Sequence, residues 1–599
     1  MTIRSFINDR IDDLGLDKGD GKYIFIILLF TVLFTIYLVW FNTMVGLRNS
    51  DVFVFLANAL QYSGTAISTT NAYMYLSPVI CLLTSILFHM GFVHKASILV
   101  VTGVFYILGS VGLYLLFRSR FNKALSFLGV ILWSTFAINI VFVADGSLYI
   151  PEVSLLIWSF LFLYLGVEKN PKYFMLSFPI FVLAFFTRYP SILFIAVIGL
   201  YLAFKYDFVG YVRLLFTDRE GFVVKFKEFL HSSDFKYMMY GVGISVLLAL
   251  VFLVVIMVAG GNFYFLQQTS NAATGSTGNP ADPNYHKDKL FYISHLRNLF
   301  YTHAQLHDDI PIILSTPSAL TNFWLGIIVV GFVLYVYDIV RSKGENFYNR
   351  IRGHKDQLAL VIGIIITSIV LVIVLFEISP VLSIVLYLID FLLIYELLKD
   401  YIADIDFKLV MISWLMVFMI FYTFTSIKVI RYMIVLTPIL AYFIICGMKM
   451  VLRYVKRVWT SRGKFDPRVC SVICIVLAVL CVVSAVMLFT SFNVHEVSDN
   501  REKAADWLVS YDPDYSTKVV ASYAPRYYTW YLKMPVINLQ VFEGLDENNV
   551  TYYISDRASN SNYHLGNWSS NYLSNSTGKY ILLKRVGNEF IYKRISTGE

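Results

Sequence analysis

Residues 23–55 read YIFIILLFTVLFTIYLVWFNTMVGLRNSDVFVF, and this stretch decides the fold class. No charged side chain occurs in 23–47, and one helical membrane span needs roughly 20 consecutive apolar residues. Arg48 and Asp51 follow at once, and the chain then returns to apolar residues. The stretch therefore predicts a membrane span with a carboxylate just beyond its end.

The composition extends this prediction to most of the chain. Of 599 residues, 58% are hydrophobic and 15% are charged, whereas soluble proteins carry about 25% charged residues. The formal net charge of +8 does not indicate nucleic acid as a partner, because the basic residues lie between apolar runs, where membrane topology places them. We expect an all-α, multi-pass protein of the cell membrane.

The apolar runs predict about thirteen membrane spans. They are 23–47, 97–117, 122–142, 149–167, 172–187, 190–205, 238–259, 321–340, 357–376, 380–398, 408–425, 430–450 and 470–492. Connections rich in Lys and Arg, such as 118–123 and 449–468, define the cytoplasmic face. An odd number of spans then places the N-terminus in the cytoplasm and the C-terminus outside.

Two segments could change this topology. Residues 173–204 contain a single charge, Arg188, and we expect a short hairpin there, because one long helix would move the basic loop 205–237 outside. Residues 78–93 are short for a span and begin with a proline. We expect them to form a helix along the outer surface.

The predicted topology gives two domains. Residues 1–492 form the transmembrane domain, with extracytoplasmic loops 48–96 and 260–320. Residues 493–599 form an extracytoplasmic domain. It starts with the helix-like run DNREKAADWLVSY, and the strand-like runs KVVASY, MPVINLQV, TYYISD and YILLKRV follow. We expect a small α+β domain.

Six ionisable residues lie where the membrane disfavours charge. They are Asp51, Asp145, Glu152, Arg188, Lys428 and Arg431. On the predicted topology all six lie at the extracytoplasmic ends of spans. Such groups are costly unless they are paired or face water, which makes them functional candidates.

Each of these residues also has an ordinary structural explanation. Asp51 could cap a helix, and Asp145 could form a turn before Gly146. Glu152 could simply pair with Arg188, and the bases near position 430 could extend to the membrane interface. The convergence of three acids and three bases on one face favours a functional site.

That set of residues suits group transfer from a lipid phosphate. Lys and Arg side chains could hold a phosphate leaving group, and one carboxylate could deprotonate an acceptor as general base. A second carboxylate could orient the first, hold a divalent metal ion or bind sugar hydroxyls. Grooves between helices would take a polyprenyl tail.

The order of these motifs resembles the GT-C fold of lipid-phosphosugar-dependent glycosyltransferases. The likeness is to the protein O-mannosyltransferase and aminoarabinose transferase branch, glycosyltransferase family 39-like. The family opens with a span followed by Asp-Glu-x-x-Tyr-x-x-x-Ala. Here DVFVFLANA keeps Asp51 and Ala59, has Phe55 at the aromatic position, and has Val52 in place of the Glu.

Later segments follow the family order. YLSPVICLLTSILFHMGF matches its proline-containing surface helix, RSRFNK its basic turn and VADGSLYIPE its acidic position. LAFFTRYPSILFI resembles its basic hairpin, and KVIRYMIVLTPIL its Arg-Tyr segment. The Trp-Trp-Asp-Tyr-Gly signature of the related oligosaccharyltransferases is missing.

The resemblance implies roles for individual residues. Asp51 would be the catalytic carboxylate and Asp145 its acidic partner. The implied phosphate-binding residues are Arg188, Lys428 and Arg431. The implied supporting or substrate-binding residues are Glu152, Tyr73, Tyr75 and Tyr432.

The sequence thus predicts an inverting membrane glycosyltransferase. It would move a sugar from a polyprenyl (dolichyl or undecaprenyl) monophosphate to a glycan, lipid or protein acceptor on the extracytoplasmic face. Two other hypotheses stay open: a transporter or flippase of a lipid-linked or anionic substrate, and a non-catalytic scaffold of a glycan assembly complex. The sequence names neither the sugar nor the acceptor, and the only cofactor it leaves open is a divalent metal ion.

Overall fold

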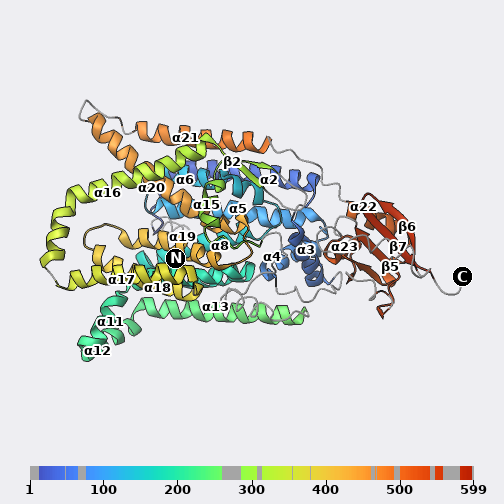
Figure 1. The fold of residues 1–599 in the computed structure, drawn as a ribbon, viewed down its shortest axis with the longest axis horizontal. Coiled ribbons are helices and arrows are strands. Elements are labelled where there is room, and N and C mark those ends of the chain that lie inside the picture. Colours follow the sequence, from blue (N-terminus) through green and yellow to red (C-terminus); the bar gives the residue numbers. More distant parts are fainter. Residues whose placement is uncertain are drawn as a thin grey trace.

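The computed structural model describes most of the chain. The described residues are 13–47, 49–64, 76–259, 285–305, 313–353, 355–377, 379–460, 466, 468–490, 500–539, 545, 547–556 and 580–595. They form a long helical bundle with a small sheet packed at one end (Figure 1).

Ten helices in the described residues are long and apolar enough to cross a membrane. They are α2 (Asp20–Val45), α5 (Lys95–Arg118), α8 (Tyr149–Glu168), α13 (Ser233–Val258), α16 (Ala319–Gly353), α17 (Lys355–Glu377), α18 (Pro380–Leu398), α19 (Ile405–Phe424), α20 (Thr437–Thr460) and α21 (Arg468–Thr490). The chain is therefore a multi-pass membrane protein.

Shorter elements connect these spans. The α-helices are α3 (Ser50–Ser63), α4 (Pro78–His89), α6 (Lys123–Thr135), α7 (Ala137–Phe142), α9 (Phe174–Thr187), α10 (Phe194–Lys205), α11 (Phe208–Thr217), α12 (Arg219–His231) and α15 (Phe291–His295). The 3₁₀ turns are η2 (Pro171–Tyr173), η3 (Tyr189–Leu193), η4 (Leu296–Leu299) and η5 (Ile430–Leu436). Strands β1 (Thr302–Gln305) and β2 (Ile313–Pro317) pair antiparallel.

The expected span over 122–142 is broken into α6 and α7. This break is one reason why ten of the described helices are long enough to cross a membrane, whereas thirteen spans were expected. Phe136 is extended between the two helices. The N–H of Ala137 donates to the carbonyl of Phe300 at 2.7 Å, from a distant loop. The Asn139 side chain donates to the carbonyl of Trp133 at 2.6 Å. Because the N–H of Ala137 bonds to a distant loop instead of to its own helix, no local pattern predicts the break.

The other two differences in the span count are short helices. The predicted turn at Arg188 is confirmed, since this residue is extended between α9 and η3. Helix α9 is too short to count as a full span, and α10 meets α11 at a bend of 64°. Helix α4 has 12 residues and is about 18 Å long, shorter than the roughly 30 Å hydrocarbon layer. It fits the expected surface helix.

The C-terminal part is the expected α+β unit. Its helices are α22 (Asn500–Tyr511) and α23 (Pro525–Leu532), with the 3₁₀ turn η6 (Tyr515–Thr517). Its strands are β3 (Val520–Ser522), β4 (Ile537–Asn538), β5 (Tyr552–Asp556), β6 (Tyr580–Val586) and β7 (Glu589–Arg594), in the order β4-β3-β5-β7-β6. The four strand-like runs match β3 to β6, whereas β7 was not predicted.

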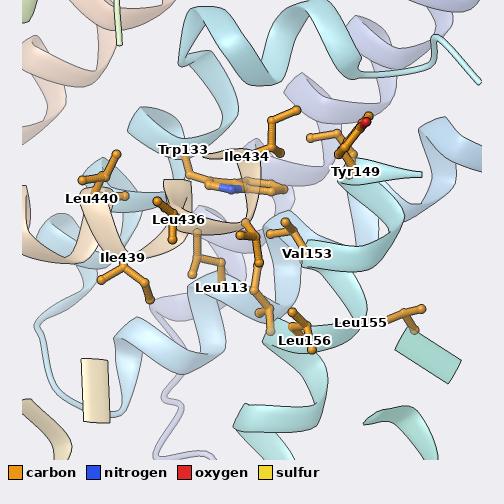
Figure 2. Packing of buried hydrophobic residues seen from close by; sticks show 14 of the residues in the cluster. Leu113, Trp133, Tyr149, Val153, Leu155, Leu156, Ile434, Leu436, Ile439 and Leu440 are labelled. Carbon is orange, nitrogen blue, oxygen red and sulfur yellow. The ribbon is translucent and has the colours of Figure 1, made fainter. Parts of the chain in front are cut away.

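The bundle core joins segments that are far apart in the sequence. Figure 2 shows Leu113 of α5, Trp133 of α6 and Val153 of α8 packed beside Ile434 of η5. The indole N–H of Trp133 donates to Thr437 at 3.1 Å. This packing fixes η5, which carries Arg431, against the first turns of α8.

Candidate active site

Asp51 lies in the first turn of α3, between two guanidinium groups. The side chain of Asn49 accepts the backbone N–H of Asp51 at 3.1 Å and so caps the helix. The Asp51 carboxylate is 45% exposed, with Arg431 Nη2 at 3.7 Å from Oδ2 and Arg526 Nη1 at 3.8 Å from Oδ1. Because Asn49 is the cap, the carboxylate faces cations and solvent instead.

Arg526 was missed by the sequence analysis. It follows Pro525 at the start of α23, in the C-terminal unit. The ring centres of Phe53 on α3 and Tyr527 on α23 lie 4.4 Å apart. Trp530, also on α23, stacks on Phe88 of α4 with their ring centres 5.8 Å apart. These contacts hold α23 beside α3 and α4 (Figure 1). The aromatic run PRYYTWY is the one signal in the sequence, but it does not say which surface the helix meets.

Arg431 has spare hydrogen-bonding capacity beside Asp51. Its guanidinium carbon lies 5.8 Å from the centre of the Tyr149 ring. Its Nε is buried, with no hydrogen-bond partner among the described residues. A buried unsatisfied donor costs free energy, so an anionic group brought to this position would be stabilised.

Arg188 and Glu152 form a buried ion pair next to Arg431. Arg188 Nη1 donates to Glu152 Oε2 at 2.8 Å, and the hydroxyl of Ser191 donates to Glu152 Oε1 at 2.9 Å. The guanidinium lies over the rings of Tyr149 and Tyr432, at 4.6 and 5.1 Å from their centres. Glu152 thus pairs with Arg188, as its structural explanation expected. Tyr432, predicted as a supporting residue, contacts the Arg188 guanidinium.

Lys428 borders this cluster from the other side. Its ammonium donates to the carbonyls of Tyr422 at 3.3 Å and Thr423 at 2.9 Å, at the end of α19, and lies over the ring of Tyr292. The hydroxyl of Tyr422 lies 3.2 Å from Arg188 Nη1. Tyr422 therefore connects Lys428, which bonds its carbonyl, to Arg188, which bonds its hydroxyl. Burial lowers the pKa of Lys428 to about 8.

Asp145 lies at the same end of the bundle as Asp51. It accepts the backbone N–H of Ser147 at 2.8 Å, the contact of an Asx turn. Gly146 has a positive φ of 84°, and a Cβ there would lie 2.6 Å from Val52. The loop of Asp145 thus packs directly against the residue that follows Asp51.

The structure does not test every predicted residue. Tyr73 and Tyr75 lie outside the described residues. Within the described ranges, no group of three or more His, Cys, Asp or Glu side chains is arranged to hold a metal ion.

Comparisons with known proteins identify the fold. A family model described as dolichyl-phosphate-mannose-protein mannosyltransferase matches residues 70–210. ArnT from Cupriavidus metallidurans, solved bound to undecaprenyl phosphate, superposes with a TM-score of 0.51 over 95% of this chain and 98% of its own, at 10% identity. The chain has the GT-C fold. Together with the family-model match, this fold supports a membrane glycosyltransferase of the GT-C type.

A second GT-C protein also matches. The oligosaccharyltransferase of Archaeoglobus fulgidus, in its apo form, aligns over 96% of this chain and 75% of its own, with a TM-score of 0.47 and 11% identity. No curated protein matches the chain in sequence.

Proposed function

We propose that the chain transfers a sugar from a polyprenyl monophosphate to an acceptor at the end of the bundle covered by the C-terminal unit. The observation that carries this proposal is the contact of Asp51 with Arg431 and Arg526, next to the buried Nε–H of Arg431, which has no partner within the described part of the chain. The carboxylate can accept a proton, and the two guanidinium groups beside it can bind a phosphate.

The proposed reaction is a single inverting displacement. Asp51 takes the proton from the acceptor hydroxyl or amine as that atom attacks the anomeric carbon. The bond from the anomeric carbon to the phosphate oxygen breaks on the opposite side, and the electron pair leaves with the polyprenyl phosphate. Arg431 and Arg526 then stabilise the negative charge on the released phosphate.

The topology of the protein is part of this proposal. Helices α11 and α12 and the C-terminal end of α5, which carry many of the basic residues, lie at the far end of the bundle from α3 (Figure 1), which supports a cytoplasmic N-terminus. The C-terminal domain (493–599) and the acceptor would then lie outside. A divalent ion near Asp51 and Asp145 stays a prediction, and assays with and without a chelator test it.

The direct test is donor consumption by the purified full-length protein. We expect radiolabelled dolichyl- or undecaprenyl-phosphate sugars to lose their sugar only when the protein and a membrane acceptor fraction are both present. NMR of the product should show the opposite anomeric configuration to that of the donor. Movement of an intact donor lipid across liposomes, without consumption, would instead support the flippase.

Arg526→Gln is expected to raise the KM for the donor roughly tenfold or more, because a charge-assisted hydrogen bond to phosphate contributes about 1.5–3 kcal/mol. The fold should be unaffected, since Arg526 is partly exposed. The matched control is Arg585→Gln on β6, in the same C-terminal unit but away from α3. An equal rise in KM for both variants would remove Arg526 from the site.

Lys428 predicts a pH dependence of donor binding. Its pKa is lowered to about 8, so the ammonium is charged below this pH and becomes neutral as the pH rises through it. We expect the KM for the donor to rise between pH 7 and 9, because one positive charge near the phosphate is lost. Lys428→Arg, which stays charged in this range, should flatten the profile. An unchanged profile in this variant would assign Lys428 to capping α19 alone.

A further inference from the structure

A cavity of about 1210 Å³ lies between α16, α19 and α20, away from the candidate active site. Helix α19 carries Lys408 on the cavity at one end and Tyr422 at the other. Its 20 residues correspond to about 30 Å. Lys408 and Tyr422 are 14 residues apart on this helix, about 21 Å, so the cavity lies toward the opposite end of α19 from Tyr422, the end that the charge pattern assigns to the cytoplasm.

Positive charge dominates the lining of this cavity. Seven basic and two acidic side chains line it. Both acids are already paired, Asp404 with Arg120 at 2.7 Å and Asp338 with Arg457 at 3.1 Å. In the part of the chain that the structure describes, Lys408, Lys449 and Arg453 pair with no carboxylate. Lys408 donates to the carbonyl of Ala403 at 2.6 Å and to the hydroxyl of Tyr335 at 3.1 Å, whereas Lys449 and Arg453 are exposed. Their positive charge beside an apolar wall would stabilise a bound anion.

Most of the remaining lining is apolar, and part of it is exposed at the surface of the bundle. Phe332 is 65% exposed, and Ile412 and Phe443 also line the cavity. At Gly331 and Gly447 the backbones of α16 and α20 are in direct contact, as small residues allow between membrane helices. A basic rim joined to an apolar wall fits a molecule with an anionic head and a hydrocarbon tail.

We propose that this cavity binds an anionic phospholipid of the cytoplasmic leaflet. Its phosphate would contact Lys449 and Arg453, and its acyl chains would lie along Phe332 and Ile412. Basic cavities between membrane helices on the cytoplasmic side bind such headgroups in other proteins. The inference is independent of the transfer reaction, because it uses none of the residues around Asp51.

Native mass spectrometry of the full-length protein in detergent tests the proposal. We expect saturable binding of phosphatidylglycerol and much weaker binding of phosphatidylcholine. Lys449→Gln with Arg453→Gln should weaken phosphatidylglycerol binding roughly 25-fold, about fivefold for each charge removed. The control is Arg219→Gln with Lys227→Gln on the exposed α12, which removes the same charge elsewhere and should leave the affinity unchanged.

Two further measurements separate the source of the anion and guard against misfolding. Ile412→Trp fills the apolar part and should weaken phosphatidylglycerol binding without removing a charge. Lys449→Arg with Arg453→Lys should bind as the unmodified chain does. Unchanged phosphatidylglycerol affinity in the Gln double variant would overturn the proposal. So would inorganic phosphate binding to the cavity as tightly as the lipid, which would identify a soluble anion.

Discussion

Asp51→Asn lowers the rate of sugar transfer about 10²–10⁴-fold, the range expected when a general base is removed. The amide cannot take the proton of the acceptor, although it keeps the size of the carboxylate. Donor binding should change little, because Arg431 and Arg526 stay in place beside the phosphate. Single-turnover transfer from a radiolabelled polyprenyl-phosphate sugar measures the chemical step directly.

The control for this variant is Glu396→Gln, which removes a carboxylate from an ion pair with Lys399. This pair lies near the opposite end of the bundle from Asp51, and Lys399 keeps Asp207 as a second partner at 4.0 Å. We expect activity within about twofold, because an exposed ion pair contributes little to stability. Full activity of Asp51→Asn would rule out Asp51 as the base and leave the carboxylate of Asp145 as the next candidate.

Glu152→Leu is expected to destabilise the protein by about 3–5 kcal/mol, because it leaves the charge of Arg188 buried without its carboxylate. The side chain of Glu152 is 1% exposed and that of Arg188 is 11% exposed. The measurement is the free energy of unfolding in mixed detergent micelles.

A double variant separates the lost ion pair from the lost packing. Replacing Arg188 by Leu as well removes the unpaired charge, so we expect Glu152→Leu with Arg188→Leu to recover part of the stability. A double variant as unstable as the sum of the two single variants would contradict a direct pair. It would indicate that the two residues act through separate contacts.

Local patterns determined much of this protein. Apolar runs such as 23–47 predict membrane helices, because hydrocarbon admits only segments that satisfy their own backbone hydrogen bonds. The short strand-like runs TYYISD and YILLKRV, which contain aromatic and β-branched residues, predict strands of the C-terminal unit. The break at Arg188 followed from charge placement, and the order of motifs in DVFVFLANA, VADGSLYIPE and KVIRYMIVLTPIL indicated the GT-C fold.

Only the tertiary structure decided which of these residues meet. It assigns the helix cap to Asn49 and so leaves Asp51 facing Arg431, and it buries Glu152 against Arg188. It also brings Arg526 from the C-terminal unit to the first helix turn after the first span. These contacts join residues far apart in the sequence, and aromatic packing and buried charge select them. Periodicity and composition describe single segments, so they do not specify which segments pack together.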